Sequence, residues 1–89
     1  MKTIRLIIKG KVQGVYFRAS AKKTADQLNI GGWVKNLPDR NVEIKATSSK
    51  EVLEKFIAWC KRGPSRAIVN EVVIEEQTPE SFSGFQIIG

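Results

Sequence analysis

The stretch KTIRLIIKGKVQGVYFRASAKKTADQLN, residues 2–29, changes its hydrophobic period partway along, and this change decides the fold. In residues 2–9 the side chains alternate, with Ile4, Leu6 and Ile8 on one side of the chain. A period of two predicts a β-strand with one buried face. A strand that leads directly into an amphipathic helix is the opening unit of a fold in which helices cover a sheet.

The helical half of this stretch lies between residues 16 and 29, where apolar residues recur at steps of four, four and three. These positions line one face of the predicted helix: Phe17, Ala21, Ala25 and Leu28. Asn29 and the pair Gly31–Gly32 tolerate the left-handed conformation, which commonly follows a helix, so the helix is predicted to end at these residues.

A β-hairpin is predicted next. Strands over Trp33–Asn36 and Val42–Ala46 flank a loop near Leu37–Asn41, where Pro38 and Asp39 are typical turn residues. A second helix follows. Ser48 and Glu51 match the spacing of a capping box, and Gly63–Pro64 supplies the stop. The apolar face of this helix has the i, i+3, i+4, i+7 pattern: Leu53, Phe56, Ile57 and Cys60.

The last predicted strand covers Ala67–Glu76, with Ile68, Val72 and Ile74 on one face, and residues 85–88 can add a short fifth strand. The order β-α-β-β-α-β predicts an α+β fold of the ferredoxin-like split type. We therefore expect an antiparallel sheet with two helices on one face, formed as a single domain over residues 1–89.

The composition narrows the chemistry that the chain can perform. Fifteen Lys and Arg against nine Asp and Glu give a net charge of +6, which attracts phosphorylated molecules, nucleic acids or acidic membranes, or serves solubility alone. The chain has no histidine, which removes the commonest general base and most zinc sites. Its one cysteine cannot form an internal disulfide. With no targeting segment and no long apolar run, a cytoplasmic location is expected.

The loop Gly10–Arg18 is the candidate binding site. It joins a strand to a helix, so unpaired amides at the helix start can face an anion, and Gly14 lets the backbone bend around it. Arg18 lies in the first helical turn, where its planar fork can hold two phosphate oxygens. Asn36, at the end of the second strand, can hydrogen-bond water but cannot act as a base. A plain connecting loop, a solvated arginine and a turn asparagine explain the same residues.

Two segments together resemble the signatures of the acylphosphatase family. These are Gly10-Lys-Val-Gln-Gly-Val-Tyr-Phe-Arg18 and Gly32-Trp-Val-Lys-Asn36, and the runs Lys61–Pro64 and Phe82–Phe85 extend the similarity along nearly the whole chain. The resemblance implies a hydrolase that cleaves small acyl phosphates to carboxylate and inorganic phosphate, with no metal or organic cofactor, as a monomer. It also implies a phosphate-binding loop made of these residues: Gln13, Gly14, Val15, Tyr16, Phe17 and Arg18. In that reading Arg18 binds the phosphate oxygens and Asn36 orients the attacking water.

The chain departs from the family pattern at three positions: Arg40, Ser48 and Arg66, where the family usually or often has glycine. Because arginine is a poor residue for positive φ, we expect Asn41 to take the left-handed conformation, with the hairpin turn moved by one residue. We interpret Arg66 as variation in a surface loop.

The sequence leaves two alternatives to the enzyme open. A nucleic-acid-binding module is suggested by the charge and the fold, but the aromatic platform of RNA-binding sheets is absent. A binding domain that keeps the phosphate loop but has lost turnover is the other. For the enzyme, no side chain is an evident base, so the substrate phosphate itself is the expected proton acceptor.

Overall fold

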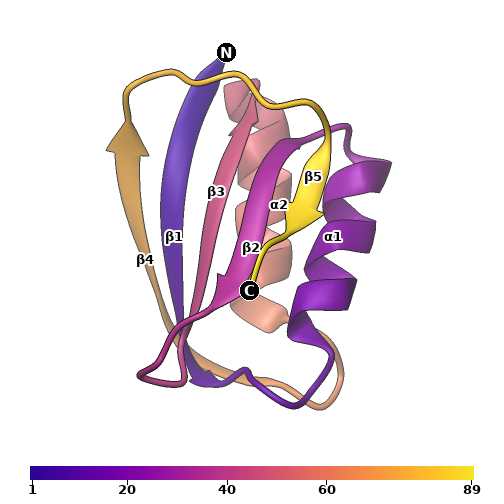
Figure 1. Cartoon of the computed structure of the whole chain (residues 1–89), viewed down its shortest axis with the longest axis vertical. Coiled ribbons are helices and arrows are strands. Elements are labelled where there is room, and N and C mark those ends of the chain that lie inside the picture. The colour runs from indigo at the N-terminus through magenta and orange to yellow at the C-terminus, as the bar shows by residue number, and fades with distance from the viewer.

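The computed structural model describes residues 1–89 and contains a five-stranded sheet and two helices (Figure 1). The elements in chain order are β1 (Lys2–Lys11), α1 (Phe17–Gln27), β2 (Gly31–Asn36), β3 (Val42–Ser48), α2 (Lys50–Arg62), β4 (Ile68–Gln77) and β5 (Phe85–Ile87). The predicted order β-α-β-β-α-β and the short fifth strand are confirmed. Neither helix is long and apolar enough to cross a membrane.

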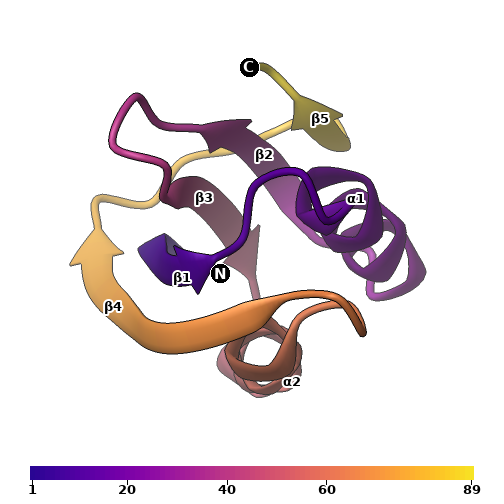
Figure 2. The same ribbon diagram turned by 90° about the horizontal axis from the view of Figure 1, so that it is seen from below.

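The strands are ordered β4-β1-β3-β2-β5 across the sheet. Strands β1 to β4 pair antiparallel, as predicted. The short β5 runs parallel to β2, so the complete five-stranded sheet is mixed. The reason is visible in Figure 1: after β4 the chain crosses above the sheet to the opposite edge and enters β5 in the direction of β2. Figure 2 shows both helices on one side of the curved sheet.

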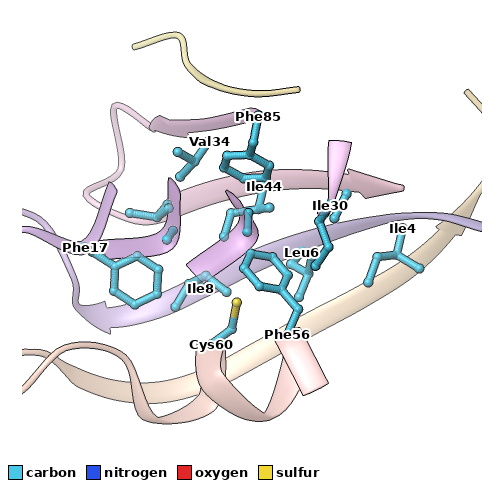
Figure 3. Packing of buried hydrophobic residues seen from close by; sticks show 14 of the residues in the cluster. Ile4, Leu6, Ile8, Phe17, Ile30, Val34, Ile44, Phe56, Cys60 and Phe85 are labelled. Atoms are coloured by element: carbon cyan, nitrogen blue, oxygen red, sulfur yellow. The ribbon is translucent and has the colours of Figure 1, made fainter. Parts of the chain in front are cut away.

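The core lies between the helices and the sheet (Figure 3). The alternating residues of β1 that were expected to be buried are buried, and Leu6 and Ile8 are fully so. Phe56 of α2 meets Phe85 of β5 edge to face, with ring centroids 6.0 Å apart. Each such side chain contributes about 1.5–3 kcal/mol through its removal from water. This packing fixes where the strand ends and their loops lie.

Helix α1 buries the face that its spacing predicts: Phe17, Ala21 and Ala25 are buried and Leu28 packs against their edge. The two alanines keep that face small, so the helix can lie close to β2 and β5. Asn29 takes the left-handed conformation after the helix, with φ of 56°, as predicted.

The start of α2 differs by one residue from the prediction. Ser49 is the N-cap, and its hydroxyl oxygen accepts a hydrogen bond from the Val52 amide at 3.3 Å. Ser48 is instead the last residue of β3, buried in the sheet. The capping-box prediction is therefore wrong, because Glu51 is only the second residue of the helix and stands too early for the reciprocal bond. The predicted stop at Gly63 is confirmed.

Strand β4 carries a second correction. Val72 and Ile74 pair with Ile8 and Leu6 and so share the helix-covered side, but Ile74 lies at the sheet edge and stays 41% exposed. Ile68 does not share that side. The register with β1 shifts between Lys9 and Gly10, and this irregularity turns Ile68 outward, 60% exposed, while its neighbour in sequence packs on the core. The period of two holds only up to the bulge.

The sheet face without helices carries a chain of ion pairs. The Arg5 Nε atom donates to Glu43 at 2.5 Å, and its Nη1 atom donates to Glu75 at 2.6 Å. The hydrogen bond that Arg5 donates to Glu43, followed by the one it donates to Glu75, raises the pKa of Arg5. Lys35 lies 3.5 Å from the same Glu43 carboxylate. Much of the basic charge on this face is thus matched by acidic neighbours.

Candidate active site

The loop between β1 and α1 is fastened by two buried valines and bends between them. Val12 and Val15 are buried in the core, while Gly14 between them is exposed and takes a φ of 75°. Tyr16, the residue before the helix, also lies in the left-handed region, with φ of 62°. A non-glycine residue in this conformation costs about 1–2 kcal/mol. The core contacts of the valines hold the loop in this bent form.

Helix α1 begins without a cap. No side chain accepts a hydrogen bond from its first amides, and its first turn contains no acidic residue. The amides of the first helical turn have no partner inside the helix, and the aligned peptide dipoles make this end partly positive. The bent loop and the helix start therefore form a cradle of donors suited to an anion.

A cavity of about 510 Å³ opens in front of this cradle. It lies at the end of the sheet where the β1–α1, β2–β3 and α2–β4 connections meet, the lower end in Figure 1. Ten residues line it: Val12, Gln13, Gly14, Tyr16, Phe17, Arg18, Ala19, Asn36, Arg66 and Ile87. The structure thus brings Arg18 and Asn36, which are far apart in the sequence, to one cavity. Of the loop residues, only Val15 is turned into the core and does not line it.

Arg18 is half-buried in the first turn of α1, and its Nη1 atom donates a hydrogen bond to the main-chain oxygen of Gly89. The same oxygen accepts the Asn36 amide at 3.2 Å. One acceptor therefore joins the guanidinium to the backbone of the asparagine. Arg18 forms no ion pair with an Asp or Glu side chain.

Asn36 is the last residue of β2, where it pairs with Val42 of β3. Its Oδ1 atom is buried and has no hydrogen-bond partner, the one side-chain polar atom of the molecule in this state. A buried acceptor without a partner costs free energy, and native proteins rarely leave one. Because Asn36 is one of the residues that line the cavity, this unpaired acceptor lies directly behind the cavity wall.

The side chain of Gln13 has a role that the sequence did not indicate. Its Nε2 atom donates to the main-chain oxygens of Leu37 at 2.9 Å and of Asn41 at 2.8 Å. Both hydrogens of the amide are thus used on the β2–β3 loop, immediately after Asn36. Gln13 ties the anion cradle to the segment that carries the asparagine.

The hairpin turn corrects the expectation about Asn41. Arg40 itself takes the left-handed conformation, with φ of 74°, and Asn41 does not. The reason is that Asn41 is held on both sides: Asp39 accepts its main-chain amide at 3.1 Å, and Leu37 donates to its carbonyl oxygen at 2.8 Å. The unfavourable φ falls on the exposed residue between these contacts, and the pairing of Asn36 is kept.

Arg66 is the residue that sequence reasoning placed wrongly outside the site. It is exposed in the loop between α2 and β4, as expected, but it also lines the cavity. The preceding Gly63 packs against the Phe17 ring so closely that an added Cβ would lie 2.9 Å from it. This contact between α2 and the start of α1 brings the loop to the cradle, and no local pattern in the sequence reports it.

The cavity contains no side chain that can act as a base. None of its lining residues is Asp, Glu or Cys. Cys60 is buried in the core, where the loss of solvation raises the pKa of its thiol and keeps it protonated. The structure groups no three potential metal-ligating side chains. The polar side chains available are therefore two guanidinium groups, two amides and the hydroxyl of Tyr16, beside the main-chain donors of the loop.

Comparisons with known proteins show the family of the chain. A family model described as acylphosphatase matches residues 4–87. The chain is 40% identical over 84 residues to an acylphosphatase of Trichormus variabilis, which covers 94% of this chain and 83% of that one. It is 43% identical over 89 residues to an acylphosphatase of Methylococcus capsulatus, covering 99% and 97%. The crystal structure of acylphosphatase from Bacillus subtilis superposes with a TM-score of 0.96 at 34% identity, covering 100% of both chains.

Proposed function

This chain belongs to the acylphosphatase family, and from that premise we propose how its own residues carry out the reaction of the family. The reaction is the hydrolysis of the carboxyl–phosphate bond of an acyl phosphate to carboxylate and inorganic phosphate. The leaving group is a carboxylate, which departs readily. The protein has mainly to position the phosphate and a water molecule and to stabilise charge on the phosphoryl oxygens.

The phosphate binds at the uncapped start of α1. Main-chain amides of the loop from Gln13 to Arg18 donate to its oxygens, and the Arg18 guanidinium holds two of them through its planar fork. Supporting this assignment, the first turn of α1 has no acidic residue, and no Asp or Glu lines the cavity beside Arg18. Donors fixed before the substrate arrives need no reorganisation as charge develops, which is the largest source of rate in such sites.

Asn36 holds the attacking water. The observation that carries the proposal is the buried Oδ1 atom of this cavity-lining residue, which has no partner within the protein. A turn of the side chain presents this oxygen to the cavity. A water molecule that donates one hydrogen to this oxygen has its lone pair free to attack phosphorus. The Asn36 main chain is fixed by β3 and by the Gly89 oxygen, so the water position is fixed as well.

The proton of the attacking water passes to the phosphate of the substrate. No carboxylate, imidazole or thiol lines the cavity, so a phosphoryl oxygen is the nearest acceptor. Asp39 is the carboxylate of the adjacent loop, and it is engaged with Asn41. We expect Asp39→Asn to keep most of its turnover. If it abolished turnover while phosphate still bound, the proton would need a protein acceptor.

We propose that residues 1–89 act as a single domain, as a cytoplasmic monomer that needs no metal or organic cofactor and engages neither nucleic acid nor membrane. The pairing of Arg5 with Glu43 and Glu75 on the open sheet face supports the exclusion of nucleic acid. Tight binding of single-stranded RNA with a steep salt dependence would contradict it.

Hydrolysis of benzoyl phosphate in ¹⁸O-labelled water tests the reaction and the point of attack together. Water held by Asn36 attacks phosphorus, so the label should appear in inorganic phosphate and none in benzoate beyond the uncatalysed background. Label in benzoate would mean attack at the carbonyl carbon and would remove the role given to Asn36. A folded protein that binds phosphate without turnover would be a binding domain instead.

A further inference from the structure

The cavity is wider than the phosphate group needs, and its outer part has its own chemistry. The cradle, Arg18 and Asn36 account for the phosphate and the water. The remaining wall is made by Tyr16, Ile87 and Arg66, which come from three different segments of the chain. The mechanism gives the side chains of these three residues no task.

Two of these three residues offer apolar surface beside the reacting group. Tyr16 is 74% exposed and Ile87 is 43% exposed, although both are large and could have been turned inward. The left-handed conformation of Tyr16 fixes the direction in which its side chain leaves the loop. Because the acyl group leaves the phosphate on the side away from the cradle, these side chains are placed to contact it.

Arg66 adds a second positive charge to this wall. It forms no ion pair, although most acidic residues of the chain do: Asp26, Glu43, Glu71, Glu75, Glu76 and Glu80. Its loop is held at both ends, by the packing of Gly63 on Phe17 and by a turn in which the Ala67 amide donates to the Pro64 oxygen at 3.0 Å. The loop therefore keeps Arg66 in the cavity wall, and no Asp or Glu lines the cavity to neutralise its charge.

On the basis of the proposed function, we infer that Arg66 forms an acyl-group subsite that selects acyl phosphates carrying a second anionic group on the acyl portion. The phosphate lies in the cradle, the acyl chain or ring lies along Tyr16 and Ile87, and a carboxylate or phosphate at its far end meets the Arg66 guanidinium. Arginine suits this task because it keeps its charge and binds a carboxylate through two donors.

Three substrates of nearly equal shape separate this role from others. They are benzoyl phosphate, its 4-carboxy derivative and its 4-carbamoyl derivative, of which only the second carries an extra negative charge. The quantity measured is the ratio of kcat/KM for the carboxy substrate to that for the carbamoyl substrate. Each variant is compared with the parent protein, so differences in intrinsic reactivity between substrates cancel.

Arg66→Gln should lower this ratio by about fivefold, the size expected for an exposed ion pair, and leave benzoyl phosphate within about twofold of the parent. Arg66→Lys should keep most of the ratio. Arg62→Gln is the matched control, because Arg62 is an exposed arginine of the preceding helix that does not line the cavity, and it should change neither value. Raising the salt concentration should reduce the ratio in the parent and not in Arg66→Gln.

The inference is overturned if Arg66→Gln leaves the ratio unchanged. It is also overturned if that variant lowers all three substrates equally and weakens inhibition by inorganic phosphate, because Arg66 would then act on the transferred phosphate. A parent protein that binds phosphate but hydrolyses none of the three overturns the proposed function itself, which is a different result from a lost preference.

Discussion

The two helices of this molecule begin in opposite ways. Helix α2 starts with Ser49, whose hydroxyl oxygen accepts a first-turn amide, and has Glu51 in its first turn. Helix α1 starts with Tyr16 in a left-handed conformation, with no side-chain cap and no acid. In α2 a serine hydroxyl and a glutamate lie at the positive end of the helix. In α1 neither is present, and the unpaired amides and the positive end of the dipole face a cavity. The difference identifies the start of α1 as the place where a negatively charged ligand would be bound.

The two ends of the sheet repeat this contrast. At one end the Thr3 and Thr47 hydroxyls lie 2.7 Å apart, and both exchange hydrogen bonds with the main chain of Glu80. These groups are satisfied among themselves. At the other end the Asn36 Oδ1 atom has no partner at all. A cavity of about 270 Å³ exists at the first end too. A cavity alone therefore does not mark a binding site, whereas a polar atom without a hydrogen-bond partner beside it does.

Among changes that alter the contrast between the two helix starts, the largest effect is expected from placing an acid at the uncapped helix. Tyr16→Asp brings a carboxylate to the cradle and should raise the inhibition constant of inorganic phosphate about tenfold or more, because it competes for the amides and repels the anion. Tyr16→Asn is the matched neutral variant, since asparagine also tolerates the left-handed conformation, and it should bind phosphate much more tightly than Tyr16→Asp. Equal phosphate binding by both variants would mean that the anion lies elsewhere.

The next effect concerns the tie between the cradle and the asparagine. Gln13→Ala removes both hydrogen bonds to the β2–β3 loop and should lower kcat about fivefold, because small displacements of a positioned water are costly. Inhibition by phosphate should change less than kcat. Exposed Gln27, at the far end of α1, is the control position. A fall in phosphate affinity alone would make Gln13 a direct phosphate ligand.

A smaller effect should follow from removing the cap of the other helix. Ser49→Ala should lower the free energy of unfolding by about 1 kcal/mol, through the loss of the N-cap hydrogen bond. In urea denaturation the midpoint should move while kcat/KM of the folded protein stays the same. Ser65→Ala, in an exposed loop, serves as the reference. A change in turnover with Ser49→Ala would show that the two helix starts are not independent.

The smallest effect is expected at the hairpin turn. Arg40→Gly removes a side chain from a left-handed position and should raise the free energy of unfolding by about 0.5 kcal/mol, the strain relieved being partly offset by the greater freedom of glycine in the unfolded chain. Activity should be unchanged because Asn36 is held by strand pairing and not by this residue. Chemical denaturation of the two proteins side by side measures the difference, and destabilisation would contradict it.

The sequence predicted what depends on neighbours along the chain. The strand β1, the loop with Gly14 and the face of α1 all follow from residues within one segment, because hydrophobic period and turn residues act locally. The β1–α1 loop and Arg18 were candidates for the same reason. Their grouping with Asn36 came from the family resemblance, because β2 approaches the β1–α1 loop only when β3 has paired with both β1 and β2.

What the sequence could not predict arises from contacts between distant segments. Gln13 binds carbonyl oxygens of another loop, and any residue type can present a carbonyl there, so no pattern marks it. Arg66 reaches the cavity because Gly63 packs on Phe17. The outward turn of Ile68 depends on a register shift between two strands. Each of these is a property of the assembled fold.

The most direct test of the account separates phosphate binding from turnover. Arg18→Ala and Asn36→Ala are compared with two controls outside the cavity, Arg62→Ala and Asn70→Ala, by benzoyl phosphate hydrolysis and by inhibition with inorganic phosphate. We predict that Arg18→Ala loses about 10³-fold in kcat/KM together with its phosphate inhibition. Asn36→Ala should lose about 10²-fold or more in kcat while phosphate still inhibits at nearly the parent concentration. If Asn36→Ala instead lost phosphate binding and kept kcat, its unpartnered oxygen would not hold the attacking water, and the central claim would be contradicted.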